Sequence, residues 1–415
     1  MAQIDISLEK PVSDYFDWGT FLIVLALTGI GLLSIYSATY DSIMEVFFYK
    51  QMISAAIGMS AMFIITFLPE RWLRFSSYGV YIISIMLLGA VFLIGVESHG
   101  TKGWLRFGGM SLQPAEVAKF GVLLLIARHL SLKGTDIRTL RDLAITIVIV
   151  GIPALMIARQ PDFGSATVFM ALLFGTLYWS GFETFILFFI VTLPAIVIAS
   201  LKGSVYYIAI VTILSLIAFL FRRHVVFTIA AITIFIGVGY GAPIIYDNMM
   251  SHQKSRIETF LNPGSNPLGS GYNVIQSIMA VGSGGLGGKG YLQGTQTQLR
   301  YIPMQWTDFI FSVPTEEFGF IGGVIVILLH LGFILRAIKI AYEVESKFYS
   351  LIAAGVASIF LYHIVINIGM AIGLMPVMGI PLPFMSYGGT SLIINMAFAG
   401  LLLNAYRNNK RGRSY

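Results

Sequence analysis

Asp308 is the side chain of this sequence best placed to do chemistry. It lies in WTDFIF, where a polar stretch meets an apolar run, with Trp306, Phe309 and Phe311 as aromatic neighbours. An apolar setting raises the pKa of a carboxyl group and suits it to act as a general base. The alternative is that Asp308 is the N-cap of a helix that begins in the apolar run. The residues alone leave both interpretations open.

Glu116 and Lys119 form a second group with chemical potential. They are three residues apart in LQPAEVAKF, on one face of a predicted helix just inside an apolar run. Ionisable side chains there are costly unless they are paired or face a polar cavity, so the two are either a structural ion pair or part of a polar site. His363 and Asn367, four apart on one face of another run, are expected to make an interhelical hydrogen bond rather than to bind a metal.

Cations and one more acidic residue flank these groups. Lys102, Trp104 and Arg106 offer two cations and an interfacial aromatic, which would suit an anionic head group, although an ordinary aromatic belt is the simpler account. Arg159 and Asp162, in IARQPDFGSA, either close a turn by an ion pair or form a site for pyrophosphate or a cation.

A glycine-rich tract, GSGGLGGKG at 282–290, precedes Asp308. It matches G-x-G-x-x-G, but no strand–loop–helix unit surrounds it, and the Walker pattern fails as well. We expect the tract to let the backbone approach a ligand closely. The acidic pair Glu316 and Glu317 follows at the start of the next apolar run, where compensation of the helix dipole in its first turn is one explanation.

The composition indicates the class of protein that must position these residues. The 415 residues are 57% hydrophobic and 11% charged, with a mean hydropathy of +0.83, which excludes an ordinary soluble protein. The net charge of +6 comes from basic residues in short connectors between apolar runs, so anionic lipids rather than nucleic acid are the expected counter-charge. The sequence has no cysteine, which excludes thiolate chemistry, disulfides and cysteine metal sites.

About twelve apolar runs are long enough to cross a membrane as helices, so the sequence predicts an all-α polytopic membrane protein. We expect a single integral membrane domain over residues 1–415. The runs are 18–38, 47–68, 77–96, 113–130, 142–158, 164–180, 183–200, 204–221, 225–243, 316–336, 349–371 and 390–406.

The basic connectors also predict the orientation of the chain. By the positive-inside rule both termini are cytoplasmic, and the large loop 246–315 and the short loop 97–112 are extracytoplasmic. A loop as long as 246–315 is usually functional. PLPFMSYGGTS, at 381–391, is expected to be a re-entrant or loop segment.

Two classes of function fit these residues. An enzyme that acts on a membrane-embedded anionic substrate would use Asp308 as a base. A lipid or solute transporter would use the same groups for binding and would need no base.

Six motifs in order resemble the SEDS family (shape, elongation, division and sporulation). The resemblance spans nearly the whole chain, and GTQTQL favours its RodA branch over its FtsW branch. The motifs are GWLRFGGMSLQPAEVAKF at 103–120, QPDFGSA at 160–166, RIETFLNPGSNPLGSGYNVIQS at 256–277, GSGGLGGKGYLQGTQTQLRYIP at 282–303, TDFIFSVPTEEFG at 307–319 and PLPFMSYGGTS at 381–391.

The resemblance implies a peptidoglycan glycosyltransferase of the bacterial inner membrane. Such an enzyme polymerises lipid II on the outer face, releases undecaprenyl pyrophosphate and serves cell elongation and rod shape. It works with a class B penicillin-binding protein, a transpeptidase, inside the elongation machinery. The competing function proposed for the family is flipping of lipid II across the bilayer without glycosyl transfer.

The family pattern also assigns roles to residues. Its essential aspartate falls on Asp308, which would be the general base. A divalent cation, magnesium or manganese with no ligands assigned, or basic side chains would stabilise the departing pyrophosphate. The substrate-binding residues are then expected to be Trp104, Arg106, Glu116, Lys119, Arg159 and Asp162.

Two departures from the family pattern are visible. The family usually has Pro-Glu before its TDFIF motif, often with His before the Thr, whereas this chain has Pro303, Met304 and Trp306. Any help that those polar residues give to substrate positioning is therefore in doubt here. An extra helical pair is also expected between residues 164 and 243, because the family plan has ten spans.

Overall fold

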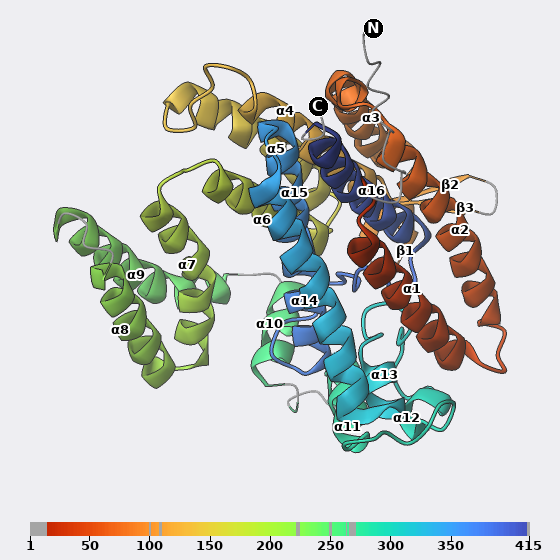
Figure 1. The fold of residues 1–415 in the computed structure, drawn as a ribbon. Coiled ribbons are helices and arrows are strands. Elements are labelled where there is room, and N and C mark those ends of the chain that lie inside the picture. Colours follow the sequence, from red (N-terminus) through yellow and green to blue (C-terminus); the bar gives the residue numbers. More distant parts are fainter. Residues whose placement is uncertain are drawn as a thin grey trace, which may run out of the picture.

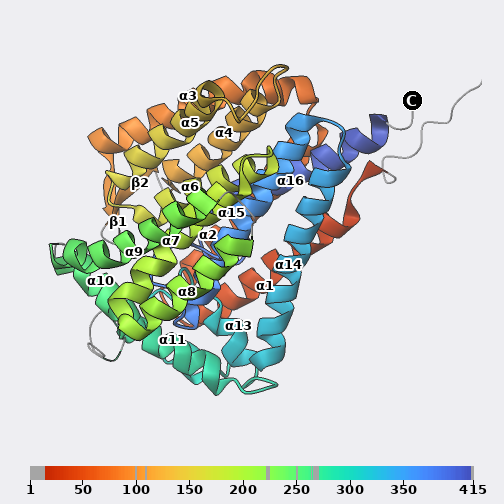
Figure 2. The same cartoon turned by 90° about the vertical axis from the view of Figure 1, so that its left-hand side faces the viewer.

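The computed structural model describes residues 15–98, 101–107, 110–220, 225–248, 251–262, 264 and 271–412, which form a bundle of long helices (Figures 1 and 2). A helix covers most of each predicted run. Among the described residues, nine helices are long and apolar enough to cross a membrane. The twelve predicted runs correspond to α1 (Trp18–Thr39), α2 (Glu45–Phe67), α3 (Glu70–Ile94), α4 (Pro114–Leu130), α5 (Leu140–Ala158), α6 (Phe163–Trp179), α7 (Thr184–Lys202), α8 (Ser204–Leu220), α9 (Val225–Asp247), α14 (Gly319–Glu343), α15 (Lys347–Ala371) and α16 (Gly389–Gly412).

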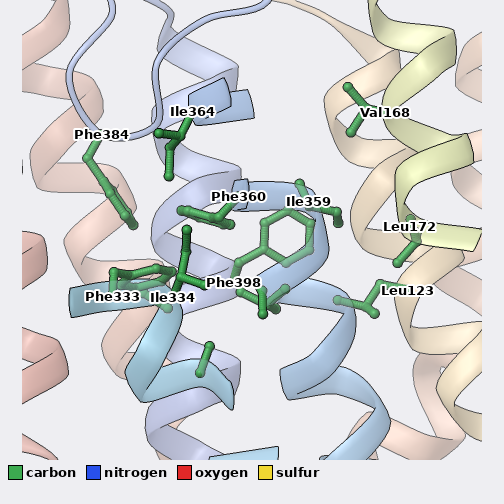
Figure 3. Packing of buried hydrophobic residues seen from close by; sticks show 14 of the residues in the cluster. Leu123, Val168, Leu172, Phe333, Ile334, Ile359, Phe360, Ile364, Phe384 and Phe398 are labelled. Carbon is green, nitrogen blue, oxygen red and sulfur yellow. The ribbon is translucent and has the colours of Figure 1, made fainter. Parts of the chain in front are cut away.

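Helix α15 lies at the centre of the bundle and packs against α4, α6, α14 and α16. Figure 3 shows Phe360 of α15 among Phe333, Phe384 and Phe398. Its ring centroid lies 4.6 Å from that of Phe333 and 5.4 Å from that of Phe384. Phe384 belongs to the non-helical segment 381–388 and has a φ of +63°, so this segment inserts a side chain into the helical core. The predicted loop or re-entrant segment, 381–391, is confirmed as non-helical over 381–388, and its last three residues begin α16.

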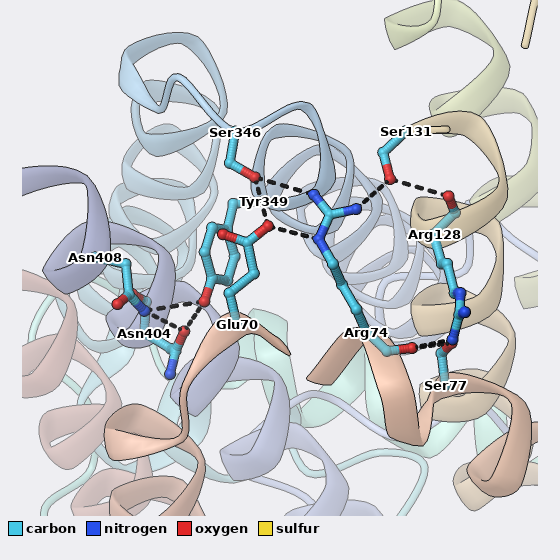
Figure 4. A network of polar contacts seen from close by, with 9 residues as sticks. All are labelled: Glu70, Arg74, Ser77, Arg128, Ser131, Ser346, Tyr349, Asn404 and Asn408. Atoms are coloured by element: carbon cyan, nitrogen blue, oxygen red, sulfur yellow. Dashed lines mark hydrogen bonds and ion pairs between the residues drawn. The ribbon is translucent and has the colours of Figure 1, made fainter. Parts of the chain in front are cut away.

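One end of the bundle is held together by a polar network (Figure 4). Arg74 donates from Nε to Glu70 Oε1 at 2.7 Å and from Nη1 to Ser131 Oγ at 3.0 Å. Asn404 donates from Nδ2 to Leu68 O at 2.7 Å. These contacts join the ends of α2, α3, α4 and α16, so the helices are fixed relative to one another at this end. Asp308 lies at the opposite end.

The short connection before α4 forms strands, which the all-helical expectation did not include. Strands β1 (Val96–Ser98), β2 (Thr101–Phe107) and β3 (Met110–Leu112) pair antiparallel in the order β1-β2-β3. In β2 the half-buried Trp104 is followed by the buried Leu105 and the exposed Arg106. A strand this short lacks a periodic signal long enough to separate it from a loop in the sequence.

The predicted large loop, 246–315, contains four short helices. They are α10 (Ser251–Leu261), α11 (Tyr272–Ser283), α12 (Thr295–Gln298) and α13 (Ser312–Glu317). Helix α11 packs against α13 and α15, and Ser277 Oγ donates to Ala371 O at 2.8 Å. This part of the chain is therefore folded back onto the bundle.

The glycine tract packs in part against the backbone of α13, and its expected close approach to a ligand stays a prediction. Gly288 has a φ of +83°, and a Cβ there would lie 2.1 Å from Glu317 O. Gly319 has a φ of +66°, and its Cβ would lie 2.4 Å from Gly288 N. The backbone amides of Lys289 and Gly290 donate to Glu316 O and Glu317 O at 3.1 and 2.9 Å. Only glycine permits this backbone-to-backbone packing against α13.

Helices α7, α8 and α9 form a unit beside the rest of the bundle (Figure 1). Phe185, Ala218 and Ala231 make a small core of their own. The three helices pack mainly on one another and reach the rest of the described bundle chiefly through α6. Together with α6 they make the four helices that cover the stretch 164–243, where the extra helical pair is expected.

Candidate active site

Asp308 lies in a non-helical turn between the polar loop and α13. Helix α13 begins at Ser312 with Phe311 as its N-cap, and no side chain caps it. The interpretation of Asp308 as a helix cap is therefore wrong. Its carboxylate is available for another task.

The backbone around Asp308 is held by two separate parts of the bundle. Tyr387 N donates to Trp306 O at 2.8 Å, and Ser386 Oγ donates to Thr307 O at 2.7 Å. Asn367 of α15 donates from Nδ2 to Asp308 O at 2.9 Å and to Ile380 O at 2.8 Å. The segment 381–388 and α15 together fix the position from which the carboxylate projects.

The Asp308 carboxylate is half-buried beside the buried rings of Phe309 and Phe311. Gly379 packs close to it, since a Cβ on Gly379 would lie 3.9 Å from Asp308 Oδ2. Burial, with a smaller contribution from the charge of Asp162, raises the pKa of Asp308 to about 6. Within the described residues no hydrogen bond or ion pair engages this carboxylate. An unpaired carboxylate with a raised pKa is suited to accept a proton near neutral pH.

Asp162 is the N-cap of α6 and faces the same region. Its Oδ1 accepts from Ser165 N at 3.0 Å, and its Oδ2 accepts from Ser165 Oγ at 2.7 Å and from Gln113 Nε2 at 3.4 Å. The expected turn-closing ion pair with Arg159 is absent from the described part of the chain. Arg159 is instead exposed at the C-cap of α5, because the cap interaction already engages Asp162.

Glu116 and Lys119 meet as an ion pair inside the bundle. Lys119 Nζ lies 2.8 Å from Glu116 Oε1, and both side chains are 2% exposed. Lys119 also donates to His363 Nε2 at 3.2 Å, while His363 Nδ1 donates to Pro381 O at 3.0 Å. The expected interhelical hydrogen bond of His363 is confirmed. The geometry favours the structural ion pair of the two alternatives, and direct contact of either side chain with a substrate stays a prediction.

Trp104, Arg106 and Arg159 lie at the same end of the bundle as Asp308. The strands that carry the first two are tied to α16, because Thr390 Oγ1 donates to Ser111 O at 3.1 Å. No hydrogen bond or ion pair between described residues joins Trp104, Arg106 or Arg159 to Asp308. Their exposed or half-buried side chains remain candidates for contact with a substrate rather than with the base.

Several residues of this region were missed in the sequence. Gln113, Gly379 and Ser386 contact the two aspartates or the backbone beside them, yet nothing local distinguishes them. Glu316 and Glu317 end α13 and are buried before α14, whose first turn holds no acidic residue, so dipole compensation in a first turn does not explain them.

The fold and this site define a polytopic membrane protein with two facing carboxylates at one end of its bundle. The model of the FtsW/RodA/SpoVE family, described as cell cycle proteins, matches residues 18–210 and 201–411. The chain belongs to this family, and the resemblance in its motifs is confirmed. The two matched stretches overlap at residues 201–210, where α7 ends and α8 begins.

Relatives with assigned names cover nearly the whole chain. It is 34% identical to peptidoglycan glycosyltransferase RodA of Treponema pallidum, over 95% of this chain and 98% of that protein. It is 33% identical to peptidoglycan glycosyltransferase MrdB of Escherichia coli, over 95% of each. Stage V sporulation protein E of Bacillus subtilis is 34% identical, over 94% of this chain and 96% of that protein.

Solved structures support the same family. A chain from a study of a peptidoglycan synthase complex that coordinates polymerization and crosslinking superposes with a TM-score of 0.72 at 29% identity, covering 95% of this chain and 98% of that one. The rod shape determining protein RodA of Thermus thermophilus superposes with a TM-score of 0.63 at 25% identity, covering 95% and 97%.

Replacing Lys119 with methionine should destabilise the protein by about 3–5 kcal/mol, because it leaves the Glu116 carboxylate buried without a partner. The double variant Lys119→Met with Glu116→Gln should recover most of that loss, since no buried charge remains. Denaturant unfolding of the purified protein in micelles, followed by tryptophan fluorescence, measures both. A double variant no more stable than the single one would show that the pair is not structural.

Proposed function

We propose that this protein is a peptidoglycan glycosyltransferase that polymerises lipid II into glycan strands for cell elongation and rod shape. The proposal is based mainly on the Asp308 carboxylate. The backbone beside it is held by hydrogen bonds, the carboxylate has no partner among the described residues, and its pKa is raised. The names of the similar proteins from Treponema pallidum and Escherichia coli support it. The alternative, a lipid II flippase, would need no such base.

Asp308 is the general base of the proposed reaction. Its carboxylate takes the proton from the 4-hydroxyl of the acceptor sugar as that oxygen bonds to the anomeric carbon of the donor. The bond from this carbon to the diphosphate breaks, and its electron pair leaves with undecaprenyl pyrophosphate. An α-linked donor gives a β-1,4 bond, so one displacement inverts the centre and one base suffices.

The remaining predicted residues bind or support the substrate. The exposed guanidinium groups of Arg106 and Arg159 suit the diphosphate, and the half-buried Trp104 suits a sugar face at the membrane surface. The Glu116–Lys119 pair lies within α4, and Lys119 connects α4 to α15 through His363, which in turn donates to Pro381 O at the start of the segment 381–388. Burial is the main cause of the raised pKa of Asp308, and the charge of Asp162 adds to it.

The active site is proposed to lie on the extracytoplasmic face of the bacterial inner membrane, with both termini in the cytoplasm. The basic connectors support this orientation. The proposed partners are lipid II, membrane lipids, a class B penicillin-binding protein and the elongation machinery, but not nucleic acid. The likeness to a chain of a peptidoglycan synthase complex supports the transpeptidase partner.

A divalent cation, magnesium or manganese, is a further part of the proposal. The described residues hold no cluster of three or more histidine, cysteine or acidic side chains. Magnesium commonly uses only one or two carboxylates together with substrate phosphates, so such an ion would need no cluster of this kind, and no ligands are assigned to it. When bound, it would neutralise charge on the leaving diphosphate.

We expect chelation by EDTA to abolish polymerisation and added Mg²⁺ or Mn²⁺ to restore it. Full polymerisation activity in EDTA would exclude the ion.

Liposomes containing the purified protein, with lipid II supplied on the side of the Asp308 loop, should produce glycan polymer. Asp308→Asn should lower the rate by about 100-fold or more, because it removes the base but keeps the size of the side chain. Gel analysis of labelled polymer measures the rate. Movement of lipid II across the bilayer without polymer would support the flippase and contradict the proposal.

The polymerisation rate should rise with pH as Asp308 loses its proton, with the acid limb near its raised pKa of about 6. Asp162→Asn keeps a good helix cap but removes the neighbouring negative charge, so the pKa of Asp308 should fall. The acid limb should then move to lower pH. An unchanged limb in this variant, measured as kcat/KM against pH, would show that the two carboxylates do not interact.

A further inference from the structure

The Glu316 carboxylate accepts hydrogen bonds from several donors in the polar loop that precedes Asp308. The side chain is fully buried at the end of α13. Its Oε1 accepts from Lys289 Nζ at 2.7 Å and from Gln296 N at 2.8 Å. Its Oε2 accepts from Thr297 N at 2.9 Å and from Thr297 Oγ1 at 2.7 Å. One carboxylate thus holds both ends of the loop 289–298.

The loop sequence is adapted to this carboxylate. A Cβ on Gly294 would lie 2.7 Å from Glu316 Oε2, so only glycine leaves room for it. Burial alone would raise the pKa of Glu316, but the hydrogen bonds from Lys289, Gln296 and Thr297 outweigh it and lower the pKa. The side chain is therefore ionised at neutral pH.

A chain of contacts leads from Glu316 to the backbone of Asp308. Thr297, held by Glu316, accepts through its carbonyl from Gln305 Nε2 at 3.0 Å. Gln305 is fully buried, and its Nε2 also donates to Ala38 O at 2.9 Å at the end of α1. Gln305 directly precedes the residues whose carbonyl groups are held by the segment 381–388 and by α15. The turn is thus held from two sides, and Glu316 controls one of them.

The neighbouring Glu317 is buried as well but has different contacts. It accepts from Ser37 Oγ and from Leu292 N, the latter at 3.1 Å. Its Oε2 is buried without a partner among the described residues. Burial raises the pKa of Glu317, which favours the neutral form. Its partner Ser37 accepts from Gln298 Nε2 at 2.9 Å, and no hydrogen bond between described residues joins Glu317 to Thr297 or Gln305.

We propose that Glu316 is a positioning residue for Asp308. Its negative charge fixes the loop 289–298, and the loop fixes the turn that carries the base through Thr297 and Gln305. The catalytic part of this inference rests on the proposed function. The mechanical part, that the charge of Glu316 orders the turn, does not.

The test compares two isosteric variants of adjacent glutamates. Glu316→Gln removes the charge that Lys289 and the backbone donors need, and should lower kcat by roughly 10- to 100-fold with little change in KM for lipid II. Glu317→Gln should retain wild-type kcat, because Glu317 bonds to Ser37 and Leu292 and not to Thr297 or Gln305, the residues that connect Glu316 to the turn. Each variant is purified in micelles, and its unfolding midpoint is measured to establish that it is folded.

Two further readouts separate positioning from support of the fold. The acid limb of the rate against pH should move in Glu316→Gln, because a loosened turn changes the burial of Asp308, and should stay in place in Glu317→Gln. Amide hydrogen exchange should increase over 304–309 in Glu316→Gln only. A Glu316→Gln protein with wild-type kcat, or with unchanged exchange over 304–309, would overturn the inference.

The outcomes also keep the two proposals apart. If the wild-type protein makes no polymer, the proposed function fails, while hydrogen exchange still decides whether Glu316 orders the turn. If the wild-type protein polymerises lipid II and Glu316→Gln does so equally well, only the positioning role fails.

Discussion

The site depends on one constraint, which is that non-helical backbone at the end of a membrane bundle must find its hydrogen-bond partners within the protein. The turn at Trp306–Asp308 meets it through Tyr387, Ser386 and Asn367. A backbone amide, a hydroxyl and a side-chain amide donate to these carbonyl groups, and none of the three donates to the Asp308 carboxylate. The carboxylate can therefore be rigid, half-buried and unpaired at once.

Much of the fold could be predicted from the sequence because hydropathy is a local property. The helices follow the apolar runs, and the isolation of Asp308 among aromatic residues was enough to single it out. The strands before α4 could not be predicted, since they are short and amphipathic only in part. The glycine tract showed that close approach was needed, but not that the approaching group was the backbone of α13.

The contacts of charged residues were the least predictable part of the site. Arg159 and Asp162 are close in sequence, yet Asp162 caps α6 instead of pairing with the arginine. Glu316 finds its donors in a loop that precedes it by many residues, and no local pattern reports such a contact. The spacing of charged residues along the chain limits which of them can form local contacts. The packing of the whole bundle then determines which contacts form.

The departures from the family pattern near Asp308 are accommodated by packing. Trp306 takes a place where the family often has a polar residue, and its ring stacks on that of Phe47 with centroids 5.6 Å apart. Met304 has a φ of +58°, an uncommon conformation for a residue other than glycine. The sequence immediately before Asp308 is therefore more apolar here than the family pattern suggests.

The separate core of α7, α8 and α9 bears on how such a chain can lengthen during evolution. A helix in lipid satisfies its own backbone and gains little from joining a larger core, so it can be added wherever the main bundle is not disturbed. The unit contacts the rest of the described bundle chiefly through α6, so amino-acid changes on its other surfaces leave the main bundle undisturbed. Lineages could thus acquire new membrane neighbours there while the chemistry at the opposite side of α15 stays constant.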